Sequence, residues 1–341
     1  MTAAPDADTA RLDDPAFAEA LTAWIDDLAD GLARSAGQRD MLRLARAELA
    51  VKERGSREVC GFSLFATLPV AIFEAVAPGR PVPIALPAAS ALSFLALDVL
   101  DDLADGDWPA HWGDRRPAEM ELTGALILSV LVPEALARAT GDPALLAALG
   151  RIHRRSLLRM ADGQREDLAA PGPSSWDMVT ARRVLTAGGP DQASGYAEMA
   201  AVLAGAGPEI VRHLAGYAHH LVGALTLWSD LADLLSPEGG DLKQGKRKVP
   251  RAAHVNALAA SERPAFLARL EAARTSEVER EALRQELRAS PAVAAVMAYR
   301  NIDLAMARAA LNRAELPDPR NLAGFIESLA GPGQRRAGSH R

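Results

Sequence analysis

The sequence has almost no cysteine, few aromatic residues and no excess of positive charge. Its 341 residues include one cysteine, Cys60, so no disulfide forms within the chain and no cysteine-based zinc or redox motif is present. This use of cysteine fits a reducing, cytoplasmic location. Aromatic residues make up 4% of the chain, so a core has to be built from alanine, leucine and valine, as in closely packed helices. The net charge of −6 argues against nucleic-acid binding, which relies on lysine and arginine.

The sequence also lacks a segment that predicts secretion or membrane insertion. Residues 1–14 are rich in alanine and aspartate and have no basic start, unlike a signal peptide. The longest uncharged stretch, 81–97, contains three prolines and is shorter than the ~20 residues that a spanning helix needs. We therefore expect no transmembrane segment.

Helical periodicity is present along nearly the whole chain. Apolar residues recur three or four positions apart near the start, at Phe17, Leu21, Ile25 and Leu28. Proline helix starts follow at Asp142-Pro143, Gly207-Pro208 and Ser290-Pro291. No run of alternating β-branched residues is bounded by tight turns, so strands are not expected. Loops are expected at 78–87, 106–117, 171–175, 236–249 and 316–319. We predict one all-α domain of ten or more helices over residues 14–330, with disordered segments at 1–13 and 331–341.

A first acidic group lies at the end of an apolar stretch. Asp98, Asp101, Asp102 and Asp105 fall on one face of a helix, at i, i+3, i+4 and i+7. Stacked carboxylates repel one another unless a cation lies between them, and hard oxygen ligands suit Mg²⁺. The apolar run 91–97 before them indicates a buried helix. The alternative is an acidic helix end that faces solvent.

A second acidic group is followed by a basic segment. Asp230 and Asp233 stand at i and i+3 after the apolar stretch 221–227. Segment 240–250 then carries four cations, among them Lys243, which stands between two glycines, and Lys246, which directly follows the second glycine. Carboxylates that hold Mg²⁺ and lysines that hold phosphoryl oxygens are what a metal-bound polyphosphate requires. Taken alone, the basic segment is more often a solvated turn.

A third polar element lies at the end of the predicted helix that begins near Asp142. Gln164 and Asp167 share a helix face, where they can orient a metal-bound water or ligand. A polar helix end is the alternative interpretation. Arg182 and Arg183, further along the chain, can supply positive charge to a pyrophosphate.

In this order and at about this spacing, the three elements resemble the trans-isoprenyl diphosphate synthase (polyprenyl synthetase) family of class I isoprenoid synthases. Residues 101–105 match the first DDxxD motif, and 163–168 match the GQxxDL element. Residues 229–233 match the second motif, and 241–250 match its DLxxGKxxxP extension. The extra Asp98 and the loop with Trp108 and Trp112 resemble a divergent branch of the family. The resemblance implies an all-α bundle around a central cavity, two Asp-rich motifs on facing helices, and a homodimer.

The resemblance also implies roles for individual residues. It implies Mg²⁺, as three ions for which Mn²⁺ can substitute, held by Asp101, Asp102, Asp105, Asp230 and Asp233, with Asp98 as a further candidate ligand. It implies that these carboxylates act in catalysis together with Gln164 and Asp167. The candidates for binding the substrate diphosphate are Arg115, Arg116, Arg182, Arg183, Lys243 and Lys246.

The predicted reaction is ionisation of an allylic prenyl diphosphate with release of pyrophosphate, and we expect it to serve prenyl transfer to isopentenyl diphosphate or another acceptor. The chain departs from the family pattern in four places, of which the first bears on the acceptor. Segment 52–57 has basic residues but not the family's GGKRxRP pattern for isopentenyl diphosphate. Arg115 and Arg116 lie further downstream of the first motif than usual, Ser229 replaces the first aspartate of the second motif, and the region of Arg182 and Arg183 replaces the family's Lys-Thr pair. The alternatives are a class I terpene synthase acting on C15, C20 or longer prenyl diphosphates, and a non-catalytic subunit of a heteromeric synthase.

Overall fold

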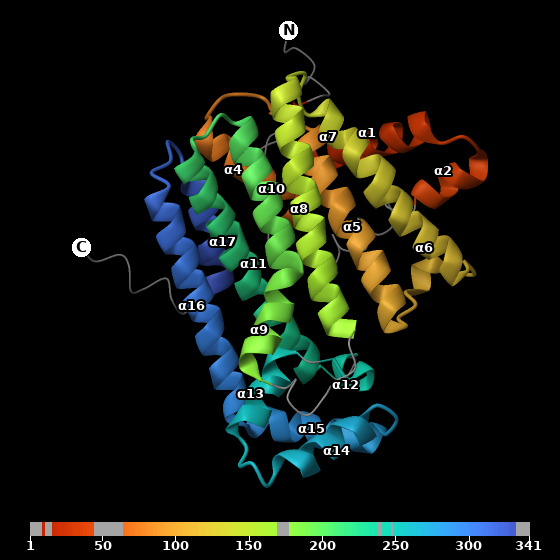
Figure 1. Cartoon of the computed structure of the whole chain (residues 1–341), viewed down its shortest axis with the longest axis vertical. Helices are drawn as coiled ribbons and strands as arrows, with labels where there is room; N and C mark the ends of the chain where they lie inside the picture. Colours follow the sequence, from red (N-terminus) through yellow and green to blue (C-terminus); the bar gives the residue numbers. More distant parts are fainter. Residues whose placement is uncertain are drawn as a thin grey trace. The chain divides into compact units, whose positions relative to one another are not determined.

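The computed structural model describes residues 9–10, 16–43, 64–168, 177–236, 240–246 and 248–331, and these are almost entirely helical (Figure 1). The helices of the first half are α1 (Phe17–Leu32), α2 (Ala36–Leu42), α4 (Leu64–Val76), α5 (Ala85–Asp105), α6 (Pro117–Leu126), α7 (Val132–Arg138) and α8 (Pro143–Leu168). Those of the second half are α9 (Met178–Ala187), α10 (Gly189–Leu203), α11 (Pro208–Leu235), α12 (Asp241–Gln244), α13 (Val249–Ala257), α14 (Arg263–Ala273), α15 (Glu277–Ala289), α16 (Pro291–Arg313) and α17 (Arg320–Ala330). A 3₁₀ turn, η1 (Ala110–Trp112), and a π-helical turn, η2 (Ile127–Leu131), complete the helical elements. The expected all-α class is confirmed.

One short strand pair departs from the expectation of no strands. β1 (Thr9–Ala10) pairs antiparallel with β2 (Val82–Pro83). A pairing of two residues is too short to produce an alternating sequence pattern, and Pro83 has no N–H with which to extend the ladder. The sequence therefore carried no signal for it.

The predicted helix starts are confirmed at the three prolines. α8, α11 and α16 begin at Pro143, Pro208 and Pro291, where the missing N–H costs nothing and the fixed φ suits a first turn. Of the predicted loops, 316–319 does separate α16 from α17, whereas 106–117 contains η1 and 236–249 contains α12. The predicted disordered ends outside residues 9–10 and 331, the loop 171–175, Cys60 and the basic segment 52–57 lie outside the described residues.

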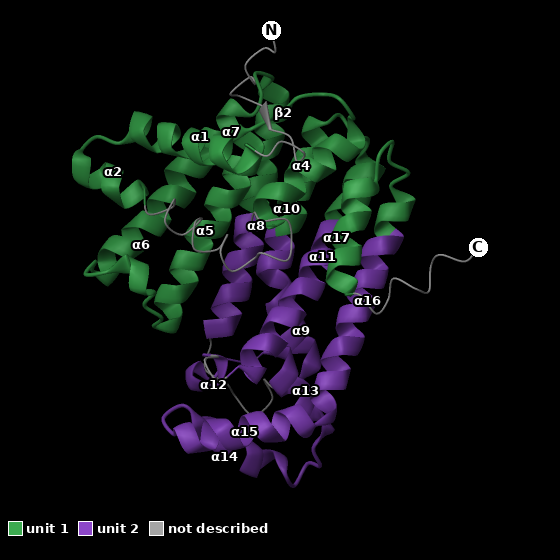
Figure 2. Cartoon of the chain, turned by 180° about the vertical axis from the view of Figure 1, so that it is seen from behind, with its two compact units in different colours: residues 1–155, 193–215, 310–331 green, residues 156–192, 216–309, 332–341 purple. Residues whose placement is uncertain are grey.

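The chain divides into two compact units (Figure 2). Unit 1 comprises residues 1–155, 193–215 and 310–331, and unit 2 comprises residues 156–192, 216–309 and 332–341. The divisions fall inside α8, α10, α11 and α16. One domain over residues 14–330 stays a prediction.

In unit 1, α5 is the helix around which others pack. It contacts α4, α6, η2 and α7, and its first half is buried. Ser90 donates to the Phe65 carbonyl at 2.6 Å, and Tyr196 donates to the Ala89 carbonyl at 2.9 Å. At Gly124 of α6 a Cβ would lie 2.9 Å from the Leu100 side chain, so α6 lies close against the second half of α5. The acidic end of α5 therefore belongs to a helix that is fixed along its length.

Residues 117–138, which form α6, η2 and α7, are the one helical segment among the described residues that is long and apolar enough to cross a membrane. Its apolar window has a mean hydropathy of 1.6 and is 44% buried. A core helix of a globular protein meets the same test, and all three elements of this segment contact α5. The absence of a transmembrane segment stays a prediction.

In unit 2, the end of α11 lies between two apolar clusters. Leu231 belongs to a cluster shared by α9, α11, α13 and α16. Leu234, one turn later, belongs to a cluster built mainly from α13, α14 and α15. Because the two leucines are anchored in separate clusters, the helical turn that carries Asp230 and Asp233 is held firmly.

Candidate active site

The first acidic group occupies the last two turns of α5. Asp98, Asp101, Asp102 and Asp105 are all half-buried on this helix. Gly106, with a φ of 74°, ends the helix, and the Asp107 N–H donates to the Asp102 carbonyl at 2.8 Å. No basic residue lies in the last turn, so these carboxylates face the negative end of the helix dipole as well as one another. A divalent cation would relieve both repulsions.

A tryptophan loop anchors the chain directly after this group. Trp112 is fully buried against Val99 and Met120, and Trp108 meets it edge-on at 4.9 Å between ring centroids. Arg115 donates to the Trp112 carbonyl at 3.0 Å.

Arg116 forms an exposed ion pair with Glu119 at 3.0 Å, and its hydrogen bonds lower the pKa of Glu119. Both arginines that were predicted to bind diphosphate in this loop thus have partners within the protein.

Asp230 is the buried carboxylate of the second acidic group. It is 6% exposed, and no described residue donates a hydrogen bond to its buried Oδ2. The nearest ion-pair partner is Lys248, whose Nζ lies 3.8 Å from Oδ1. Burial raises the pKa of Asp230 to about 6, although Lys248 acts in the opposite direction. Among the described residues, this buried carboxylate therefore has an oxygen that accepts no hydrogen bond.

Asp233, one turn later, holds the backbone that follows. Its Oδ1 accepts from the Gly240 N–H at 3.2 Å and its Oδ2 accepts from the Asp241 N–H at 3.1 Å. Burial raises its pKa, and the neighbouring Asp241 adds to that effect. Asp233 therefore joins the end of α11 to the start of α12.

The segment that the sequence indicated as a basic loop is a helical turn followed by the start of a helix. Gly245, with a φ of 75°, ends α12, and Pro250 lies in the first turn of α13. Lys243 is exposed and Lys246 is half-buried. The glycine and the proline of the DLxxGKxxxP pattern thus set the backbone conformation at the end of α12 and in the first turn of α13.

Arg251 is a member of this group that sequence reasoning missed. It follows Pro250, is 1% exposed, and its Nη1 donates to the Asp241 carbonyl at 2.9 Å. Burial lowers the pKa of Arg251, while the charges of Asp241, Asp230, Asp167 and Asp233 oppose that shift. An arginine in the first turn of a short helix usually faces solvent, so the sequence held no signal of this burial. The charges of three predicted residues of unit 2, Asp167, Asp230 and Asp233, thus act on one guanidinium.

The GQxxDL element lies at the end of α8, where Gln164 and Asp167 are half-buried. Its glycine marks a close approach of two helices. A Cβ at Gly163 would lie 2.2 Å from the Cβ of Ala187 in α9, well inside the contact distance of two carbons. The α8 end that carries Gln164 and Asp167 is thereby packed directly on α9.

Gly163→Ala is expected to lower the free energy of unfolding by about 1–3 kcal/mol, because the added methyl group overlaps Ala187 and the helices have to separate. The matched control is Gly216→Ala in α11, where a Cβ meets nothing within 4 Å. That control is expected to gain up to about 1 kcal/mol of helix propensity. Urea denaturation followed by circular dichroism measures both. Equal stability of the two variants would show that α8 and α9 do not pack this closely.

Arg182 and Arg183, the predicted pyrophosphate arginines of α9, are both held by carboxylates. Arg182 donates from Nη1 and Nη2 to the two oxygens of Asp303, at 2.9 and 3.2 Å, and Asp303 is 2% exposed. His220 Nδ1 lies 3.1 Å from the same carboxylate. Burial raises the pKa of Asp303, but hydrogen bonds from His220 and Arg182 outweigh it and the net shift is downward. Arg183 pairs with Glu166.

Within the described ranges, no three or more His, Cys, Asp or Glu side chains are arranged to hold a metal ion by themselves. The donor chemistry nevertheless fits Mg²⁺: the carboxylates are hard oxygen ligands, and the buried Oδ2 of Asp230 accepts no hydrogen bond from any described residue. Mg²⁺ commonly takes one or two protein carboxylates and completes its shell with water and substrate phosphates. The side chains present therefore suit a metal that arrives with a phosphorylated ligand.

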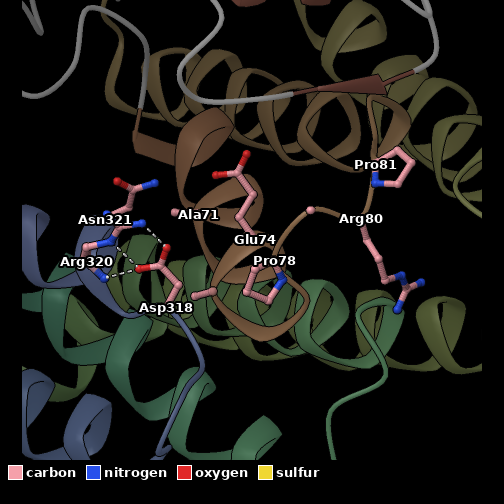
Figure 3. A pocket seen from close by; sticks show the side chains of 10 residues that line it. Ala71, Glu74, Pro78, Arg80, Pro81, Asp318, Arg320 and Asn321 are labelled. Carbon is pink, nitrogen blue, oxygen red and sulfur yellow. Dashed lines mark hydrogen bonds and ion pairs between the residues drawn. The ribbon is translucent and has the colours of Figure 1, made fainter.

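A pocket of unit 1 contains none of the predicted site residues (Figure 3). It has a volume of about 530 Å³ and lies between the end of α4 and the start of α17. Its charged side chains are engaged with the protein: Arg320 pairs with Asp318 at 2.6 Å, and Arg80 donates to the Ala204 carbonyl at 3.0 Å. We assign it no part in the chemistry of the acidic groups.

No protein-family model and no curated protein matches this sequence, but solved structures match its fold. Geranylgeranyl pyrophosphate synthase from Corynebacterium glutamicum, complexed with isoprenyl diphosphate and magnesium, has a TM-score of 0.76 at 18% identity, covering 94% of this chain and 99% of that one. Decaprenyl diphosphate synthase from Rhodobacter capsulatus has a TM-score of 0.74 at 18% identity, covering 94% and 98%. Polyprenyl synthase from Caulobacter crescentus, complexed with calcium and isoprenyl diphosphate, has 0.71 at 22%, covering 94% and 97%. The protein therefore has the fold of the polyprenyl and geranylgeranyl diphosphate synthases.

Proposed function

We propose that this protein is a member of the trans-isoprenyl diphosphate synthase family that ionises an allylic prenyl diphosphate and releases pyrophosphate. The observation that carries the proposal is the carboxylate of Asp230, buried at the end of α11 with an oxygen to which no described residue donates. Burying an ionised carboxylate without such a donor costs several kcal/mol, and functional sites are where proteins keep such groups. The order of the motifs and the fold support the same reaction.

The chemistry needs positive charge at the leaving group. Mg²⁺, when bound, would act as a Lewis acid that stabilises charge on the departing pyrophosphate. Asp101, Asp102 and Asp105 would hold metal in unit 1, with Asp98 as a further ligand. Asp230 and Asp233 would hold metal in unit 2. The proposal includes three Mg²⁺ ions, for which Mn²⁺ can substitute.

Lysines are the cations best suited to hold the phosphoryl oxygens. Lys243 is exposed and Lys246 is half-buried, and both lie on a turn that Asp233 and Gly245 fix. The four candidate arginines would have to exchange their protein partners for phosphate. Gln164 and Asp167, packed on α9 through Gly163, would orient a water or a metal ligand.

Prenyl transfer is the reaction that we propose after ionisation, with isopentenyl diphosphate as a weakly held acceptor. Segment 52–57 lacks the GGKRxRP pattern, and scattered arginines attract a second diphosphate only weakly and in a salt-sensitive manner. The same departure favours a second candidate, a terpene synthase that turns C15, C20 or longer substrates into a hydrocarbon or alcohol.

We further propose that the protein is a cytoplasmic homodimer. Light scattering on the purified protein tests the dimer.

Purified protein with Mg²⁺ is expected to release pyrophosphate from farnesyl or geranylgeranyl diphosphate alone, because the ionising groups do not depend on the acceptor. Coupled phosphate detection and extraction of the organic layer measure the release and the products. Elongated diphosphates, formed when isopentenyl diphosphate is added, would show prenyl transfer, whereas hydrocarbons or alcohols would show a terpene synthase.

Turnover that strictly requires isopentenyl diphosphate would refute weak acceptor binding and indicate an ordinary chain-elongating synthase. A protein that consumes no allylic diphosphate but activates a co-expressed synthase would be a non-catalytic subunit, and the proposed reaction would be wrong.

A further inference from the structure

The guanidinium of Arg251 is built into the second acidic group. The residue lies in the first turn of α13 and is 1% exposed. Its Nη1 donates to the Asp241 carbonyl at 2.9 Å, and the same carbonyl accepts from the N–H groups of Gly245 and Lys246, at 3.0 and 3.3 Å. One oxygen therefore ties Arg251 to the turn that carries the lysines of the basic segment.

The charges of aspartates from three helices act on this guanidinium. Asp167 belongs to α8, Asp230 to α11 and Asp241 to α12, and each favours the charged form of Arg251. The effect is mutual, because Arg251 and Lys248 both favour the ionised form of Asp230. An arginine stays charged under all ordinary conditions. The acidic group thus contains a permanent cation before any metal reaches it.

The charge of Arg251 changes the affinity of the second acidic group for a divalent metal ion. It offsets the repulsion among the carboxylates, so the turn and the end of α11 keep their arrangement without metal. It also repels an incoming divalent ion, and one unit charge a few ångströms away in a buried site lowers the affinity for that ion by about tenfold or more. A ligand that brings its own negative charge together with the metal cancels that penalty.

We propose that Arg251 is a positioning residue that makes metal binding at the second acidic group depend on a diphosphate. Arg251 holds the Asp241 turn in place and keeps the affinity of Asp230 and its neighbours for a free divalent cation low. The diphosphate then supplies the missing negative charge and oxygen ligands. This inference rests on the proposed function for the identity of the anion.

The test is a Mn²⁺ titration of the full-length protein followed by electron paramagnetic resonance of free Mn²⁺, with and without inorganic pyrophosphate. The background carries Asp101→Ala and Asp102→Ala, so that the first acidic group does not bind metal. Arg251→Gln removes the charge but keeps a donor for the Asp241 carbonyl, and Arg251→Lys keeps the charge. The matched control is Arg284→Gln in α15, an arginine 3% exposed whose partners are Glu277 and Glu281.

The parent protein in this test is the chain that carries Asp101→Ala and Asp102→Ala. Pyrophosphate is expected to raise its Mn²⁺ affinity by tenfold or more. Arg251→Gln should bind Mn²⁺ alone about tenfold more tightly than the parent, with a smaller effect of pyrophosphate. Arg251→Lys and Arg284→Gln should behave like the parent. Circular dichroism checks the fold of each variant.

Two outcomes would overturn the inference and leave the proposed function standing. One is a parent protein that binds Mn²⁺ equally well with and without pyrophosphate. This outcome refutes the inference even if Arg251→Gln fails to fold. The other is a folded Arg251→Gln variant with the metal affinity of the parent. If the protein with Asp101 and Asp102 intact binds no Mn²⁺ under either condition, the proposed function fails, and this inference fails with it.

Discussion

Asp102→Ala is expected to lower the rate of pyrophosphate release from an allylic diphosphate by about 100-fold or more, and Asp101→Ala should act alike. Each change removes an oxygen ligand from a metal that would stabilise the leaving group, and groups of this kind contribute such factors to catalysis. Release of pyrophosphate from farnesyl diphosphate at saturating Mg²⁺ measures the effect. The matched control is Asp114→Ala, an exposed aspartate in the loop that follows α5, which should keep the parent rate.

The same variants should fold at least as well as the parent protein. Removing one carboxylate from the last turns of α5 relieves repulsion from its neighbours and from the negative end of the helix. Thermal unfolding without metal should therefore show an equal or higher midpoint. Near-normal turnover of Asp102→Ala with every allylic diphosphate tried would make the first acidic group structural and contradict the proposed mechanism.

Asp230→Asn is expected to lower the rate of pyrophosphate release about as much as Asp102→Ala does. It is also expected to stabilise the metal-free protein. Asparagine has nearly the same shape, but it cannot supply an anionic oxygen to a metal. Because burial disfavours the ionised carboxylate of Asp230, its neutral replacement should raise the free energy of unfolding by about 2 kcal/mol at neutral pH. Urea denaturation without metal measures the gain, and pyrophosphate release measures the loss.

The pH dependence of that gain follows from the direction of the pKa shift. Burial raises the pKa of Asp230 from 3.8 to about 6, so ionisation destabilises the folded state. The advantage of Asp230→Asn should be full above about pH 6, shrink as the pH falls, and vanish below about pH 4, where the parent carboxyl is protonated in both states. A gain that does not change between pH 4 and pH 7 would show that Asp230 is not held in this way.

Several features of this protein follow from the sequence by itself. Pro143, Pro208 and Pro291 mark helix starts because a proline is best tolerated in the first turn of a helix, where its missing N–H costs no hydrogen bond. The spacing of Asp98, Asp101 and Asp105 places them on one face of α5 because the helical period is fixed at 3.6 residues per turn. Composition and periodicity were therefore sufficient for the all-α class and for the positions of the acidic residues along their helices.

Local sequence did not reveal why particular motif residues are needed. Gly163 reads as part of a polar pattern, but the packing of Ala187 against α8 is what excludes a side chain there. Gly245 and Pro250 resemble parts of a basic loop in the sequence, but Gly245 ends α12 and Pro250 lies in the first turn of α13. These reasons depend on backbone conformation and on contacts between elements that are separate in the sequence.

Only the tertiary structure decided which charged side chains already interact with other groups of the protein. Arg182 reads as a free cation, yet it is paired with Asp303, which follows it by 121 residues. Arg251 reads as a surface residue, yet it is buried among aspartates of three helices. The physical reason is that the charge available to a ligand depends on burial and on neighbours brought together by folding, because electrostatic energy follows distance in space and the local dielectric and not separation along the chain.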